Sequence, residues 1–271
     1  MEQGKKIQMV VFDWAGTTVD YGSLAPLYTF EKVFRNAGLT LTRDEINKPM
    51  GMEKKAHIRA LLSEPGIKEQ WIRLYGREWS EEDVENLYAD FEGELYQVVK
   101  EYSQPLDGVV DTVGQLRDMG IRIGSTTGYN AWMMEQVSPQ AAQKGYQPDC
   151  LVTPDDTGTG RPTPFMMFEC MLRMNVYPPR TVVKVGDTVA DILEGKNAGA
   201  WSIGVLTGSN LLGLTKEEYD AMDFEQRQEK KRKAEEKYLQ AGADLVIDHI
   251  GLLPEAVLKI NELLSKEELG Q

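Results

Sequence analysis

Short apolar segments alternate with helical patterns from about residue 105 onward, and this alternation constrains the fold more than any other feature. The segments that favour strands lie at 121–126, 149–153, 181–186, 201–206 and 244–248. The helical patterns between them lie at about 108–119, 130–145, 164–175 and 188–198. Strands that alternate with helices form parallel sheets with helices on both faces. Together with an apolar segment at 9–12, they predict a Rossmann-like α/β core.

Residues 23–103 break this alternation, because they contain helical patterns and no convincing strand. These patterns lie at about 24–37, 42–48, 52–62, 67–78 and 80–102. Ser80 is the expected N-cap of the last one, since the three acidic residues after it favour the first turn of a helix. We therefore predict an all-helical cap domain at 23–103, inserted into a core domain formed by residues 1–22 and 104–271.

The composition limits the classes of partner and the compartment. The net charge of −13 argues against nucleic acid, because phosphate backbones need a basic surface. No segment approaches the roughly 18 apolar residues of a membrane span, and no N-terminal apolar run reaches signal-peptide length. Cys150 and Cys170 lie in apolar contexts, which favours reduced core residues of a cytoplasmic protein over a disulfide. The charged segment 213–240 predicts a pair of solvated surface helices.

Two carboxylates follow apolar strands directly. Asp13 follows the strand at 9–12, and Asp187 follows the strand at 181–186. The carboxyl ends of parallel strands border the crevice in which α/β folds bind their ligands. Oxygen ligands suit Mg²⁺, which usually takes one or two carboxylates together with phosphate and water. The sequence therefore predicts a magnesium site at this edge of the sheet.

Four motifs in this order resemble those of the haloacid dehalogenase superfamily. Asp13 belongs to the first, Thr126 or Thr127 to the second, Arg161 to the third and Asp187 to the fourth. In that superfamily the first Asp attacks phosphorus, a Ser or Thr holds a phosphoryl oxygen, and a Lys or Arg balances the phosphate charge. Each motif alone is typical of an ordinary turn or helix cap. The resemblance therefore depends on the set.

The first motif departs from the superfamily pattern at Ala15. Phosphatases of the superfamily carry an Asp there, which protonates an oxygen leaving group. A chain that keeps the nucleophile Asp13 and lacks this acid is either inactive or does not expel an alkoxide. If the bond to be broken joins phosphorus to carbon, the leaving carbanion needs an electron sink. A lysine that condenses with a neighbouring aldehyde provides one, because the protonated imine accepts the electron pair.

Lys54, in the helical insert, is the candidate for this lysine. A helix is expected to start near Met52, and on it Lys54 and His57 share a face because they are three residues apart. Lys55 points about 100° away and is expected to be solvated. His57 has two interpretations: it moves protons during imine formation, or it packs and hydrogen-bonds within the insert.

With this lysine included, the chain resembles the phosphonoacetaldehyde hydrolase (phosphonatase) family over nearly its whole length. The resemblance implies a Mg²⁺-dependent, homodimeric enzyme that converts phosphonoacetaldehyde and water into acetaldehyde and phosphate. The matching segments are 13–22, 48–51, Lys54, His57, 124–129, 152–156, 160–162 and 184–188. One departure is Ser23, which stands where relatives carry a cysteine.

The resemblance also implies roles for single residues. Asp13 would be the nucleophile and Lys54 the imine former. Mg²⁺ would be held by Asp13, the backbone carbonyl of Ala15 and Asp187, with Asp191 orienting the site from outside the ligand set. The residues that would contact the substrate are Thr127, Arg161, Met50, Gly51 and Tyr129.

Two other functions stay open at this point. The first is a phosphate-ester phosphatase or sugar phosphomutase on the same fold, against which Ala15 argues. The second is an inactive, phosphatase-like binding module. The presence of Asp13, Arg161, Asp187 and Asp191 together argues against loss of activity.

Overall fold

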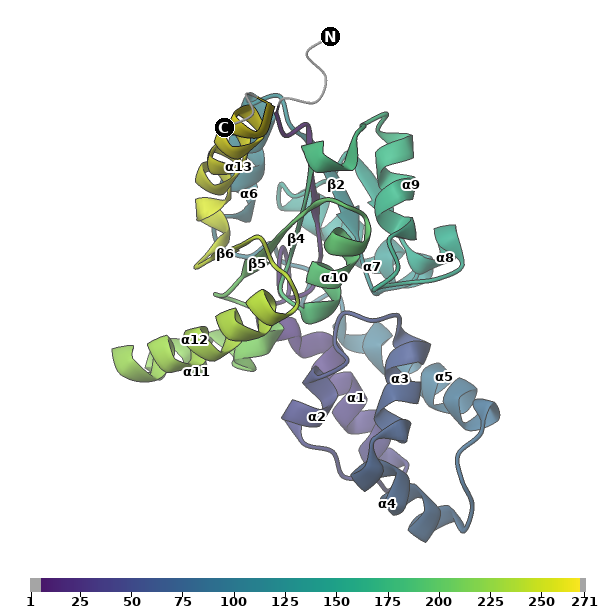
Figure 1. The fold of residues 1–271 in the computed structure, drawn as a ribbon. Coiled ribbons are helices and arrows are strands. Elements are labelled where there is room, and N and C mark those ends of the chain that lie inside the picture. Colours follow the sequence, from purple (N-terminus) through teal and green to yellow (C-terminus); the bar gives the residue numbers. More distant parts are fainter. Residues whose placement is uncertain (1–5, 269–271) are drawn as a thin grey trace.

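The core of the computed structural model, which describes residues 6–268, is a six-stranded sheet with every strand pair parallel (Figure 1). The strand order is β3-β2-β1-β4-β5-β6. The strands are β1 (Met9–Phe12), β2 (Arg122–Thr126), β3 (Cys150–Val152), β4 (Val182–Gly186), β5 (Trp201–Val205) and β6 (Leu245–Ile247). The chain winds outward in opposite directions from β1 and β4, so a crevice opens between their carboxyl ends.

Helices cover both faces of this sheet. One face packs against α6, α7 and α13, and the other packs against α9 and α10. These helices are α6 (Val109–Asp118), α7 (Ala131–Gln143), α9 (Phe165–Arg173), α10 (Val189–Asn197) and α13 (Leu253–Glu268). The predicted α/β fold with a parallel sheet is therefore confirmed.

The central strand shows why the sequence forms this sheet. Met9 and Val11 of β1 point into the cluster that contains α9, whereas Val10 and Phe12 point into the cluster on the opposite face. All four side chains are fully buried. A strand covered on both faces needs an uninterrupted apolar run, which residues 9–12 provide.

The insert between β1 and β2 is helical, with no strand between residues 24 and 98. Its helices are α1 (Leu24–Asn36), α2 (Arg43–Asn47), α3 (Lys54–Ser63), α4 (Pro65–Tyr75) and α5 (Glu81–Val98). Ser80 caps α5 through a capping box with Asp83, as the sequence predicts. The helix expected near Met52 begins two residues later, because the Glu53 side chain caps the backbone N–H groups of α3. We retain the division into core and cap domains as a proposal.

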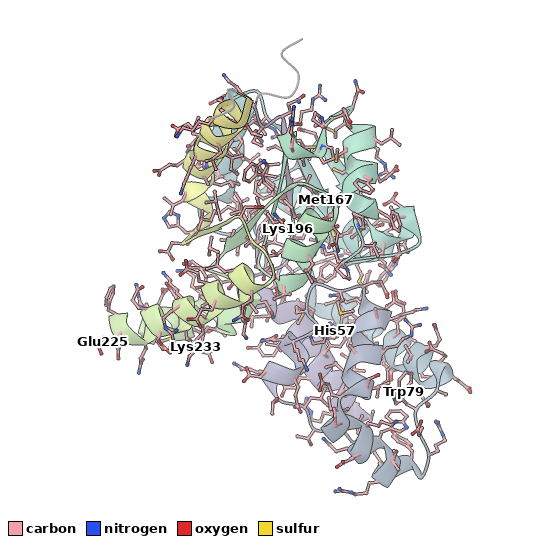
Figure 2. The ribbon with its side chains drawn as sticks, viewed as in Figure 1. His57, Trp79, Met167, Lys196, Glu225 and Lys233 are labelled. Carbon is pink, nitrogen blue, oxygen red and sulfur yellow. The ribbon has the colours of Figure 1, made fainter. Side chains whose placement is uncertain are left out.

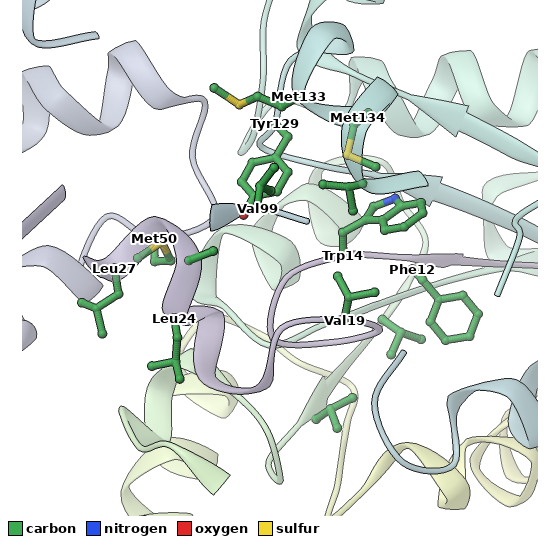
Figure 3. Close-up of a cluster of buried hydrophobic side chains, with 14 of the residues drawn as sticks. Phe12, Trp14, Val19, Leu24, Leu27, Met50, Val99, Tyr129, Met133 and Met134 are labelled. Carbon is green, nitrogen blue, oxygen red and sulfur yellow. The ribbon is translucent and has the colours of Figure 1, made fainter. Parts of the chain in front are cut away.

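The helical insert, called the cap below, lies beyond the carboxyl ends of β1 and β4 (Figure 1). One hydrophobic cluster joins it to the core (Figure 3). Leu27 and Met50 of the cap belong to this cluster, and so do Trp14 after β1 and Tyr129 after β2. Apolar packing therefore holds the cap against the edge of the sheet where the predicted site residues lie.

The charged segment forms two surface helices, as predicted. They are α11 (Lys216–Ala221) and α12 (Phe224–Gln240), and Figure 2 shows Glu225 and Lys233 on the projecting part of α12. Cys150 and Cys170 are both free and buried. A short helix that was not predicted, α8 (Pro154–Thr157), follows β3. Among the described residues, no helix is both long and apolar enough to cross a membrane.

Close packing between β5 and α12 gives a test of the fold. A Cβ atom at Gly204 would lie 2.5 Å from the ring of Tyr238, which is fully buried. We expect Gly204→Ala to lower the free energy of unfolding by about 1–3 kcal/mol, because the ring has no space to move. Thermal or urea unfolding would measure this.

Gly93, inside α5, is the matched control, since a Cβ there meets no atom within 4 Å. We expect Gly93→Ala to stabilise the protein by about 0.5–1 kcal/mol, because alanine loses less backbone entropy in a helix. Equal effects of the two substitutions would contradict the packing described for Gly204.

Candidate active site

Asp13 lies at the carboxyl end of β1, between β2 and β4. Its backbone N–H donates to the carbonyl of Val185 at 2.9 Å, which continues the sheet ladder by one residue. Its carbonyl accepts a hydrogen bond from the Thr18 hydroxyl at 2.9 Å. The Asp13 side chain is buried, and the strand and the turn after it fix its backbone on both sides.

The turn after Asp13 requires glycine at position 16. Gly16 has φ of 87°, and a Cβ atom there would lie 2.1 Å from Oδ2 of Asp187. The absent side chain therefore leaves space beside this carboxylate. The carbonyl of Ala15 accepts a hydrogen bond from the Ser23 hydroxyl at 2.8 Å. Ser23 thus contacts the backbone oxygen that the family resemblance assigns to the metal.

Asp187 follows β4 and is held by several hydrogen bonds. The Thr17 hydroxyl donates to Oδ1 at 2.9 Å, and the backbone N–H of Asn210 donates to Oδ2 at 2.8 Å. The Tyr238 hydroxyl donates to the Asp187 carbonyl at 2.7 Å. Asp13, Asp187 and Asp191 offer ligand oxygens that lie within 4.8 Å of one another.

Arg161 connects these carboxylates. Its Nη1 lies 2.6 Å from Oδ1 of Asp13 and 3.0 Å from Oδ1 of Asp191, and its Nε lies 2.9 Å from Oε2 of Glu194. The guanidinium is fully buried. Burial opposes the charged form, but the three carboxylates outweigh it and raise the pKa of Arg161. Arg161 therefore carries a permanent positive charge beside Asp13.

Lys184 and Glu194 belong to the same buried network, although the sequence analysis assigned them no role. Lys184 Nζ lies 3.1 Å from Asp191 Oδ1 and 3.1 Å from Glu194 Oε2. Two signals in the sequence point to them. Lys184 interrupts the apolar run of β4, and Glu194 follows Asp191 by three residues, so both acids lie on one face of α10.

The buried charges in this network do not balance. Four carboxylates, namely those of Asp13, Asp187, Asp191 and Glu194, face two cations, Arg161 and Lys184. This excess of negative charge favours a bound cation. Hard carboxylate oxygens and the open space beside Gly16 fit Mg²⁺.

The pKa shifts agree with this imbalance. Burial raises the pKa of Asp187 well above its usual value, and the charges of Asp13 and Asp191 add to the effect. Burial also raises the pKa of Asp13, although Arg161 offsets part of the rise. For Asp191 burial is outweighed by Arg161 and Lys184, and its pKa is lowered. Asp13 and Asp187 are therefore the carboxylates that a divalent cation would relieve most.

A small cavity beside Asp13 collects most of the predicted site residues. The predicted residues that line it are Asp13, Ala15, Met50, Gly51, Lys54, Thr127, Tyr129 and Arg161. Ser23 and Thr188 also line it. A larger cleft between cap and core shares Lys54, Gly128 and Arg161 with this cavity. That cleft provides the route from solvent.

Lys54 is the first residue of α3 and reaches the cavity from the cap. Lys54 is 4% exposed, and its Nζ lies 5.1 Å from the centroid of the Tyr129 ring. Burial lowers the pKa of Lys54 to about 8, and the charge of Asp13 offsets part of the shift. A fraction of the amine is therefore neutral near pH 7. Lys55 instead pairs with Glu85 on the surface, at 2.7 Å.

The two threonines after β2 face different surroundings. The Thr126 hydroxyl donates to Glu194 at 2.9 Å and accepts from Lys184 at 2.8 Å, so it belongs to the buried network. Thr127 lines the cavity. Of the two, Thr127 is therefore placed to contact a bound ligand.

His57 lies inside the cap (Figure 2). It is not among the residues that line the cavity. Its Nε2 lies 2.9 Å from the carbonyl of Ile46, and its ring packs against Phe30 with centroids 4.0 Å apart. Burial lowers the pKa of His57 well below its usual value, and the charge of Lys54 adds to this. The neutral ring therefore donates from Nε2 to Ile46. This geometry favours the hydrogen-bonding interpretation, while the role in proton transfer stays a prediction.

Comparison with known proteins places this chain in a family. Residues 7–199 match the family model of haloacid dehalogenase-like hydrolases. The phosphonoacetaldehyde hydrolase of Bacillus cytotoxicus is 44% identical over 97% of this chain and 98% of its own. That of Parabacteroides distasonis is 46% identical over 95% and 98%. The crystal structure of a phosphonoacetaldehyde hydrolase-like protein from Oleispira antarctica has 34% identity and a TM-score of 0.95, covering 97% of this chain and 96% of that one.

The buried network predicts a large cost for removing one cation. Lys184→Met leaves Asp191 and Glu194 with less positive charge in a site that water does not reach. We expect the free energy of unfolding to fall by about 3–5 kcal/mol, as for other broken buried pairs. Lys196→Met is the control, because Lys196 pairs with Asp244 at the surface (Figure 2). It should cost less than about 1 kcal/mol. Similar losses in urea unfolding would contradict the network.

Proposed function

The chain belongs to the phosphonoacetaldehyde hydrolase family of the haloacid dehalogenase-like hydrolases, and on this premise we propose that it cleaves the C–P bond of phosphonoacetaldehyde. The products are acetaldehyde and phosphate. One observation carries the proposal. Lys54 from the cap and Asp13 from the core line the same cavity. The sequence agrees with it, because Ala15 stands where a phosphatase would need an acid to protonate the ester oxygen.

Substrate binding depends on opposite charge at the core side of the cavity. Arg161 lies beside Asp13 and balances the charge of the phosphonate group. Thr127 contributes a hydroxyl for a phosphonate oxygen. Met50, Gly51 and Tyr129 enclose the aldehyde end and exclude water.

Lys54 then provides the electron sink. Its neutral amine adds to the aldehyde carbon, water leaves and the imine nitrogen takes up a proton from solvent, which gives a protonated imine. An Asp13 carboxylate oxygen attacks phosphorus as the C–P bond breaks, and the electron pair of that bond moves into the imine. The results are an enamine on Lys54 and a phosphoryl group on Asp13. Protonation of the enamine carbon and two hydrolysis steps release acetaldehyde and phosphate, and restore both side chains.

Asp13, the carbonyl of Ala15 and Asp187 would hold Mg²⁺. When bound, the ion would offset the repulsion between the Asp13 carboxylate and an anionic phosphonate. Asp191 does not join this set in the proposal, because its oxygens are engaged by Arg161, Lys184 and Thr188. Its function is to keep the two cations in place. Proton transfer by His57, the homodimer and the cytoplasmic location are further parts of the proposal.

Lys54→Arg tests the imine. Arginine keeps the positive charge but forms no imine under these conditions, so turnover of phosphonoacetaldehyde should fall to background. Phosphate should still bind, because Arg161 is unchanged. Borohydride added with substrate should label Lys54 in the wild type, as located by mass spectrometry, and should label nothing in the variant.

Lys55→Arg is the control for this substitution, because Lys55 pairs with Glu85 outside the cavity. It should turn over substrate at nearly the wild-type rate. Phosphonoacetate, alkylphosphonates and sugar phosphates should not be cleaved, since none places an aldehyde beside a C–P bond. The proposal fails if Lys54→Arg retains a rate near that of the wild type.

The lowered pKa of Lys54 predicts the pH dependence of imine formation. Only the neutral amine attacks the aldehyde, so the rate of borohydride trapping should rise with pH and level off above about 8. Below this pH it should fall about tenfold per unit. An ordinary lysine would instead give a rise that continues to about pH 10.4. A midpoint at about pH 10.4 would show that Lys54 is not buried in the reacting enzyme.

A further inference from the structure

Asn210 links the predicted metal site to the cap. It begins the short turn after β5, and its backbone N–H donates to Oδ2 of Asp187 at 2.8 Å. Its side-chain Nδ2 donates to Oδ1 of Asn47 at 2.7 Å. Asn47 is the last residue of the cap helix α2. One residue of the core therefore contacts both the carboxylate and the cap.

The surroundings of Asn210 show that its side chain is directed at the cap. Asn210 is 1% exposed, and its Oδ1 is buried without a hydrogen-bond partner among the described residues. Leaving a buried amide oxygen unpaired is costly. Among the described residues, the hydrogen bond from Nδ2 to Asn47 is the one polar contact of this side chain.

A second contact joins the same part of the cap to the metal side of the core. A Cβ atom at Gly51, four residues after Asn47, would lie 2.3 Å from the Thr188 hydroxyl. Thr188 is the N-cap of α10, and its hydroxyl donates to Asp191 at 2.6 Å. The cap segment from Asn47 to Gly51, which leads to Lys54, therefore lies against the turn at Asn210 and the start of α10. Both of these elements donate hydrogen bonds to carboxylates of the site.

We infer that Asn210 is a positioning residue that couples docking of the cap to the metal affinity of the core. With the cap docked, the hydrogen bond to Asn47 fixes the turn that directs the Asn210 N–H at Asp187. When the cap moves away, this hydrogen bond is lost and the turn is free to shift. The inference rests on the proposed function in one respect, namely that Asp187 is a Mg²⁺ ligand.

The coupling works in both directions, because linked binding equilibria are reciprocal. A docked cap strengthens Mg²⁺ binding, and bound Mg²⁺ favours the docked cap. Lys54 lines the cavity beside Asp13 only in the docked arrangement, so this coupling would place Mg²⁺ beside Asp13 when the imine-forming lysine is present. The size of the coupling is limited to that of one neutral hydrogen bond, about two- to tenfold in affinity.

Two substitutions at Asn47 test the link. Asn47→Leu removes the acceptor, and we expect Mg²⁺ to bind about two- to tenfold more weakly in calorimetry without substrate. Asn47→Asp keeps an oxygen at the acceptor position, so its Mg²⁺ affinity should stay within about twofold of the wild type. Asp44→Asn is the control, because Asp44 lies on α2 and lines the same surface cleft as Asn47 and Asn210, but has no side-chain bond to Asn210. It should leave Mg²⁺ affinity unchanged.

A double substitution separates the link from general damage. Asn210→Ala should weaken Mg²⁺ binding as much as Asn47→Leu does, and the double variant should bind no more weakly than either single one. Thermal unfolding would confirm that each variant is folded. Unchanged Mg²⁺ affinity in Asn47→Leu, or additive losses in the double variant, would overturn the inference.

These outcomes are distinct from failure of the proposed function. Mg²⁺ binding is measured without phosphonoacetaldehyde, so a wild type that binds Mg²⁺ and cleaves no C–P bond would refute only the proposed reaction. A wild type that binds no Mg²⁺ at millimolar concentration would overturn the metal assignment and this inference together.

Discussion

Two buried cations hold together the carboxylates at the edge of the sheet, and the arrangement of the site depends on this contact. Arg161 and Lys184 lie among Asp13, Asp191 and Glu194, and the side chains of both cations are fully buried. Removing such charges from water is costly, and only opposite charges at close range compensate for it. These ion pairs therefore fix the positions of the Arg161 loop, the strand β4 and the helix α10 relative to one another.

In the proposed reaction, the cap supplies the amine that forms the imine, and contact with the core changes the environment of this amine. Cap and core together bury Lys54, and this burial lowers the pKa of its amine to about 8, so a fraction of the amine is neutral near physiological pH. The same docking brings its Nζ to the cavity that Asp13 lines. A lysine on an open cap would have a smaller neutral fraction, and in the proposed reaction the core alone would have a nucleophile without an electron sink. The proposed reactivity is thus a property of the interface between cap and core.

Much of the fold could be predicted because it follows from local patterns. The apolar runs of β1 and β4 indicate strands buried on both faces, and the alternation after residue 105 indicates parallel pairing. Element ends were less certain, because single side chains decide them. Glu53 delays the start of α3, and the four-residue helix α8 carries too short a pattern to recognise.

The sequence by itself determined which residues could carry the chemistry, because Asp13, Ala15 and Asp187 occupy fixed places at strand ends and Lys54 lies in a distinctive segment of the cap. Only the tertiary structure decided which of several candidate residues line the cavity and which belong to the buried network. Thr127 lines the cavity, whereas Thr126 and Glu194 belong to the buried network. The His57 ring hydrogen-bonds to the carbonyl of Ile46. These choices depend on contacts between segments far apart in the chain, and local sequence patterns do not specify such contacts.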